Sequence, residues 1–184
     1  EAKATGHMGV SSHPATRPAA AEAEAIGRLL RLAQVVDIPV VVVHLTCKEG
    51  YDVIMEARRR GQKVYVETCP QYLLMDDSLY ELPGMEGAKY VCAPPLRKKE
   101  DQECLWHGLA AGQIQTVSTD HCSFTTEQKA LGKKDFTKIP GGMPGVETRG
   151  TLLYTYGVDA GRITKEQMCR VLSENPARLY GMYP

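Results

Sequence analysis

The chain has 184 residues, with 22 basic and 22 acidic side chains and therefore no formal net charge. Hydrophobic residues make up 43% and charged residues 24%, which is ordinary globular usage and excludes a disordered chain. The charge balance gives no reason to expect a nucleic acid or a membrane surface as a partner. No apolar run approaches the roughly 20 residues that span a bilayer, and no signal-peptide pattern is present, so we expect a soluble, cytoplasmic protein.

Helix and strand patterns alternate along the chain. The predicted elements are, in order, a helix over 19–36, a strand over 40–43, a helix over 48–60, a strand over 64–68, a polar connection over 70–99, a helix over 101–111 and a strand over 115–119. The run Val40–Val43 is β-branched without polar alternation, which is typical of a strand buried on both faces. Strands separated by helices predict an α/β fold with parallel pairing.

The C-terminal part is predicted to be an ordered loop followed by helices. The loop covers 121–145 and contains Gly-Gly and Pro-Gly turn signals. Helices are expected over 147–160 and 164–173, with a short one near 176–180.

Six cysteines are spread along the chain without a CxxC pair. An even count permits a disulfide framework, but a chain of this length can build a core without one. Zinc-finger and zinc-ribbon spacings are also absent. We therefore expect reduced thiols, most of them buried.

Two polar residues end hydrophobic strands. His44 follows four valines, and Asp120 follows the third predicted strand. In (β/α) architectures the C-terminal ends of the strands form the active-site face, and imidazole and carboxylate are ligands that suit zinc. The alternatives are a histidine satisfied within the core and an aspartate that caps the next turn.

The other histidines give weaker signals. His121 is interpreted as a residue that orients a ligand, with an ordinary loop residue as the alternative. His7, His13 and His107 are expected to have no chemical role. No Ser-His-Asp order, nucleophile elbow or phosphate-binding loop is present.

Six segments together resemble the hydantoinase/dihydropyrimidinase family of the amidohydrolase superfamily. They run in family order at family-like spacing, and they are Gly6–Ala25, Val42–Cys47, Glu67–Leu73, Pro94–Arg97, Ser118–Cys122 and Lys138–Arg149. The resemblance implies a metal-dependent (β/α)₈ TIM barrel that hydrolyses cyclic amides such as hydantoins and dihydropyrimidines. It also implies two divalent metal ions, usually zinc, a small-molecule cyclic amide substrate and a homo-oligomer, commonly a tetramer.

The resemblance also implies roles for individual residues. By motif match, His44 is similar to the metal ligand that ends the sixth barrel strand. Asp120 is similar to the catalytic aspartate that ends the eighth, ligates a metal and moves the proton. Ala93 and Gly141 match the positions that bind the substrate ring through backbone groups. A metal lowers the pKa of bound water, and a carboxylate beside it can accept the proton and pass it to the leaving nitrogen.

Two positions bear on the substrate. Gly141 stands where family members typically carry asparagine, although a backbone contact would survive that change. Gln71 stands where dihydroorotase-like and allantoinase-like relatives tend to carry histidine, and glutamine is similar to the hydantoinase pattern. A hydantoinase or dihydropyrimidinase is therefore expected, with an allantoinase or dihydroorotase as an alternative.

The family's other metal ligands have no candidate in this chain. These are a His-x-His pair, a carboxylated lysine and a further histidine. Residues 1–184 are therefore expected to be the C-terminal portion of one barrel domain, roughly strands 6–8 with their helices. A complete barrel needs about 250 residues. By this resemblance, the first half of the barrel and the terminal β-sandwich are expected to be absent from these residues, and the fragment is expected to be inactive alone. A non-catalytic scaffold protein of the same superfamily is the other alternative.

Overall fold

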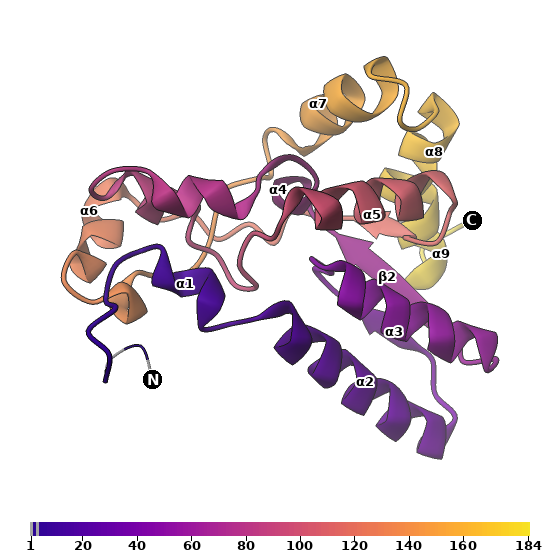
Figure 1. Ribbon diagram of the computed structural model, residues 1–184. Coiled ribbons are helices and arrows are strands. Elements are labelled where there is room, and N and C mark those ends of the chain that lie inside the picture. Colours follow the sequence, from indigo (N-terminus) through magenta and orange to yellow (C-terminus); the bar gives the residue numbers. More distant parts are fainter. Residues whose placement is uncertain (1, 3) are drawn as a thin grey trace.

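The computed structural model describes residue 2 and residues 4–184 (Figure 1). Its first half contains α1 (Ser12–Ala15), α2 (Ala19–Val36), β1 (Val40–Val42), α3 (Lys48–Arg59), β2 (Val64–Thr68) and α4 (Pro70–Leu74). Next come the 3₁₀-helices η1 (Asp77–Glu81) and η2 (Glu86–Tyr90), then α5 (Lys99–Ala110) and β3 (Thr116–Val117). The remainder contains α6 (Thr126–Lys129), η3 (Ala130–Gly132), η4 (Phe136–Lys138), α7 (Arg149–Leu153), the π-helix η5 (Tyr154–Asp159), α8 (Lys165–Cys169), the π-helix η6 (Arg170–Glu174) and α9 (Asn175–Leu179).

The three strands form one parallel sheet in the order β1-β2-β3. Val40 pairs with Val64, and Glu67 pairs with Thr116. The α/β class with parallel pairing is thereby confirmed. Because the pairing is parallel, the C-terminal ends of all three strands lie at the same edge of the sheet.

Helices cover one side of this sheet. In α2, Ile26, Leu30 and Ala33 are buried at helical spacing, and the helix packs along α3. In turn, α3 packs against β2 and α5, so α2, α3 and α5 lie side by side in front of the strands (Figure 1). The predicted bounds of α2 and β2 agree with the structure.

The prediction that the run Val40–Val43 is buried on both faces is wrong, because in β1 only Val42 is buried and Val43 is 45% exposed. The strand β2 is also covered unequally on its two faces. Val64, Val66 and Thr68 are buried, whereas Tyr65 and Glu67 between them are partly exposed. This alternation shows that one face packs against the helices while the described residues cover the other face incompletely.

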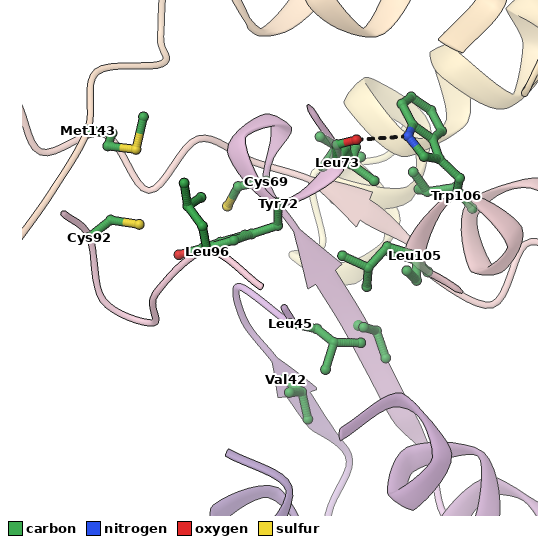
Figure 2. Close-up of a cluster of buried hydrophobic side chains, with 14 of the residues drawn as sticks. Val42, Leu45, Cys69, Tyr72, Leu73, Cys92, Leu96, Leu105, Trp106 and Met143 are labelled. Carbon is green, nitrogen blue, oxygen red and sulfur yellow. Dashed lines mark hydrogen bonds between the residues drawn. The ribbon is translucent and has the colours of Figure 1, made fainter. Parts of the chain in front are cut away.

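The connection 70–99, expected to be polar, contains three short helices and part of the hydrophobic core. Figure 2 shows Tyr72 and Leu96 in this cluster beside Cys69 at the end of β2. The Trp106 indole nitrogen of α5 donates to the Leu73 carbonyl at 3.0 Å. Apolar side chains in turns and short helices therefore extend the core beyond the strand ends.

Two other sequence expectations have mixed outcomes. The described cysteines are free thiols, but only Cys47, Cys69 and Cys92 are buried, so the expectation that most are buried is wrong. Across the described residues, no helix combines the length and the apolar character that crossing a membrane requires.

Arg58 connects the N-terminal ends of β2 and β3, which lie opposite the strand ends that carry His44 and Asp120. Its guanidinium donates to the carbonyl oxygens of Val64 and Gln113, each at 2.7 Å, and to Gln115 Oε1 at 2.7 Å. These acceptors lie where β2 begins and just before β3, so one side chain of α3 fixes the starts of two strands.

His13, which was expected to have no chemical role, is a second polar anchor. Its ring is buried and Nε2 donates to the Cys92 carbonyl at 2.8 Å, while Nδ1 accepts from Arg17 Nη1 at 3.3 Å. Burial, with the nearby cations Arg17 and Lys129, lowers the pKa of His13 from 6.5 to about 4. The ring is therefore neutral near pH 7.

We predict that Arg58→Met lowers the free energy of unfolding by about 2–4 kcal/mol, because it leaves several backbone and amide oxygens without a donor. Denaturant unfolding measures the change. Arg59→Met is the matched control, since Arg59 is exposed and should change stability by less than about 0.5 kcal/mol. Equal effects of the two substitutions would contradict the anchoring role.

We predict that His13 makes the protein less stable as the pH falls from 6.5 to about 4. In this window the unfolded chain binds a proton that the native ring does not, so the free energy of unfolding falls by roughly 3 kcal/mol. Unfolding measured across this range should lose that part of its pH dependence in His13→Gln. The exposed His107→Gln should keep it, and an unchanged profile in His13→Gln would refute the assignment.

Candidate functional site

The ends of the three strands form a row that is held by hydrogen bonds. The Leu45 amide donates to the Glu67 carbonyl at 2.8 Å, and Thr68 Oγ1 donates to the Leu45 carbonyl at 2.8 Å. Gln71 Nε2 donates to the Thr119 carbonyl at 3.2 Å. The Ser118 amide also donates to the Thr68 carbonyl at 3.0 Å. The segments that carry His44 and Asp120 are therefore fixed to β2 and to α4, the helix that follows it.

His44 and Asp120 share an unusual backbone conformation. Their φ angles are 41° and 48°, in the left-handed region that non-glycine residues seldom occupy. Neither side chain has a hydrogen-bond partner among the described residues. Strained backbone and unpartnered polar side chains at the ends of two parallel strands indicate a ligand site.

These two residues supply only part of a metal site. One imidazole and one carboxylate suit zinc, but a zinc ion takes four ligands. No group of three or more His, Cys, Asp or Glu residues that could hold a metal occurs within residues 2 and 4–184. The donor types therefore fit a metal, while the number of donors in this chain is too small to hold one.

Ala93 and Gly141 come from distant segments and lie next to each other. A Cβ atom placed on Gly141 would lie 3.8 Å from both Cβ and N of Ala93. Both residues are exposed, and neither amide N–H has an acceptor among the residues that the structure describes. Two neighbouring free amides can hold a small polar ligand through its oxygen atoms.

A buried ion pair connects the strand ends to the segment that carries Ala93. Arg97 and Glu22 are 8% and 11% exposed and meet at 2.9 Å. Glu22 also accepts from the amide and the hydroxyl of Thr46, two residues after His44. Arg97 Nη1 donates to the Arg17 carbonyl at 2.5 Å.

A groove of about 610 Å³ lies beside this network. His44 and Ala93 both line it, together with apolar residues of α2 and β1. The network and the groove thus bring two of the predicted site residues onto one surface.

The hydrogen bonds of His121 go to the loop that follows Gly141. Its Nδ1 accepts from the amides of Gly145 and Val146 at 3.1 and 3.3 Å. No hydrogen bond between His121 and Asp120 occurs in the described part of the chain. In the structure, His121 therefore holds the loop after Gly141, and its action on a ligand stays a prediction.

The two buried thiols Cys69 and Cys92 near the strand ends are not nucleophiles. Burial raises the pKa of Cys69 to about 12, with a smaller contribution from the negative charges of Glu67 and Asp120. Burial also raises the pKa of Cys92 to about 11. Both remain protonated at neutral pH, so thiolate chemistry is excluded at these two positions.

Sequence reasoning gave no structural role to two residues around the site. Lys129 lies in a polar stretch that resembles any exposed loop, yet its side chain is buried and contacts the backbone beside Gly141. His13 lies in a Gly/Ser/Pro-rich segment and contacts the backbone beside Ala93. Both side chains donate to backbone carbonyls, and a motif of side-chain types in the sequence does not reveal such contacts.

No family model matches the chain. Curated relatives do match it, and the chain spans about two fifths of their length. It is 47% identical to a D-hydantoinase of Geobacillus stearothermophilus over 180 residues, which are 97% of this chain and 38% of the relative. It is 45% identical to a D-phenylhydantoinase of Escherichia coli over 174 residues, which are 94% of this chain and 37% of the relative.

Solved structures agree with these relatives. The dihydropyrimidinase of Brevibacillus agri superimposes with a TM-score of 0.97 at 47% identity, over 100% of this chain and 40% of that chain. The L-hydantoinase (dihydropyrimidinase) of Arthrobacter aurescens superimposes with a TM-score of 0.90 at 36% identity, over 99% of this chain and 40% of that chain. Such matches along the whole chain, in sequence and in structure, show that the chain belongs to the hydantoinase/dihydropyrimidinase family.

Proposed function

We propose that this chain is the C-terminal part of the barrel of a longer, metal-dependent cyclic amidohydrolase. The complete protein would open a hydantoin or dihydropyrimidine ring, as the names of the matched relatives suggest. The observation that carries the proposal is the pair His44 and Asp120, both at strand ends, both in the left-handed conformation and both without a partner among the described residues.

An uncovered surface supports the longer barrel. On the outer edge of β1 no strand pairs among the described residues, and Val43 is 45% exposed. In α2, Leu32 is 63% exposed and Val35 is 83% exposed. Apolar surface of this kind beside a free strand edge favours further strands and helices there.

In amide hydrolysis, the residues of this chain would bind a metal, transfer a proton and hold the substrate ring. A divalent metal, zinc by the family pattern, would supply an activated water and polarise the amide carbonyl. His44 and Asp120 would provide two of the metal's ligands, and the rest would come from outside this chain. The Asp120 carboxylate would accept a proton and return it to the leaving nitrogen. The free amides of Ala93 and Gly141 would hold the ring.

Two alternatives lead to different results in the same assay. The complete protein should be tested with hydantoin, dihydrouracil, allantoin and dihydroorotate. Fastest turnover of allantoin or dihydroorotate would indicate one of the other cyclic amidases. A scaffold protein would turn over none of the four and would bind no metal. Full hydrolysis by the isolated 184-residue chain would refute its proposed inactivity.

We predict that Asp120→Asn in the complete protein lowers kcat at least a thousandfold, because the amide cannot carry the proton. Asparagine has the same shape and tolerates the left-handed backbone, so folding should be preserved. Asp37→Asn is the control, since Asp37 also has a positive φ (50°) and lies at the end of α2. Normal turnover of Asp120→Asn would remove Asp120 from the mechanism.

We predict that His44→Asn weakens metal binding at least tenfold, because it removes a metal ligand. Elemental analysis of the purified complete protein after dialysis measures the bound metal. His107→Asn is the matched control, because His107 is exposed on α5 and is not one of the residues that follow the strand ends. Equal metal content in the two variants would show that His44 is not a ligand.

A further inference from the structure

Lys129 is a buried cation that the proposed mechanism does not use. Its side chain is 4% exposed. Its Nζ donates to three backbone carbonyls, those of Val91 and Pro140 at 2.7 Å and that of Gly142 at 2.9 Å. Three donors are the full capacity of an ammonium group, whereas a neutral amine has only two. The geometry therefore requires the charged form.

This charge has no carboxylate partner among the described residues. Burial lowers the pKa of Lys129, which reflects the cost of removing the ammonium from water. The Phe124 ring, 5.4 Å from Nζ, adds only a weak attraction. The three carbonyls are thus the main compensation, and a buried charge of this kind calls for a reason beyond filling space.

The three carbonyls belong to the two segments that carry Ala93 and Gly141. Val91 lies two residues before Ala93, and Pro140 and Gly142 flank Gly141. The Gly142 amide donates to the same Val91 carbonyl at 2.9 Å. The two segments are already joined without the lysine, so holding them together is not its distinctive contribution.

The Pro140 contact fixes the direction of one particular amide. The Pro140 carbonyl and the Gly141 N–H belong to the same peptide group, which is trans. In a trans peptide the C=O and the N–H point in opposite directions. Because the carbonyl points at Lys129, the Gly141 N–H points away from it, and the positive charge polarises the peptide so that this N–H is a stronger donor.

We propose that Lys129 is a positioning residue that orients the Gly141 N–H toward a carbonyl oxygen of the substrate ring. This inference rests on the proposed function, because it takes the ring of a cyclic amide as the ligand. The free amide of Ala93, next to Gly141, supplies a second donor to the same ligand. Among the described residues, the hydrogen bonds of Lys129 Nζ all go to backbone carbonyls, and Lys129 acts through Gly141.

The test is steady-state kinetics of Lys129→Met in the complete protein with hydantoin or dihydrouracil. We expect KM to rise about tenfold or more, with kcat within about threefold and metal content unchanged, because the lost interaction binds the ring in both ground and transition states. Lys133→Met, an exposed lysine of the same segment, should leave KM unchanged. A fall in kcat with unchanged KM would show a merely structural role and overturn the proposal.

Chemical rescue provides an independent measurement. In Lys129→Ala, added n-propylammonium replaces the missing atoms and the charge, so KM should recover severalfold. Neutral 1-propanol, of the same size, should not restore it. No recovery with the cation, or equal recovery with both, would refute the role of the charge. The rescue remains informative if Lys129→Met fails to fold.

The wild-type protein separates this inference from the proposed function. If it turns over none of the four rings, the proposed function fails. The dissociation constant for hydantoin, measured by calorimetry, then takes the place of KM. Weaker binding to Lys129→Met would support the positioning role, whereas equal binding, or no binding to either protein, would overturn it.

Discussion

Parallel pairing of three short strands is the constraint on which the whole arrangement depends. Because β1, β2 and β3 run in the same direction, their C-terminal ends meet at one edge, and the residues that follow them are brought together. The ladder is only a few residues long, so side chains must secure its register. Arg58 does this where the strands start, and Gln71 and Thr68 do it where they end.

The positions of Ala93 and Gly141 are set by irregular backbone rather than by helices or strands. Ala93 and Gly141 lie outside every helix and strand, and their segments are held by buried polar side chains. His13 fixes the carbonyl of Cys92, and Arg97 with Glu22 fixes the turn after His44. Removing one partner of such a buried network leaves a polar or charged group without compensation. The backbone is therefore held in the one conformation in which all of these groups are paired.

The regular elements could be predicted because they depend on local patterns. The helix over 19–36 and the strand over 64–68 agree with the structure, since helical spacing and β-branched runs have local causes. The short helices between residues 70 and 90, which bury Tyr72 and Tyr80, could not be predicted, because five residues are too few for helical spacing to show. His44 and Asp120 could be found because strand ends are visible in sequence. Lys129 could not, since its acceptors are backbone carbonyls far along the chain.

The use of cations to hold these segments has a physical reason. An amide that must bind a ligand has to be left without a competing acceptor inside the protein. A buried carboxylate would itself accept from such an N–H, whereas an ammonium or a guanidinium can only donate. A cation that binds the carbonyl side of a peptide therefore fixes its orientation and leaves its N–H free. The three carbonyls around Lys129 have this arrangement beside the Gly141 amide, which has no acceptor among the described residues. The resulting polarisation favours a ligand with exposed carbonyl oxygens.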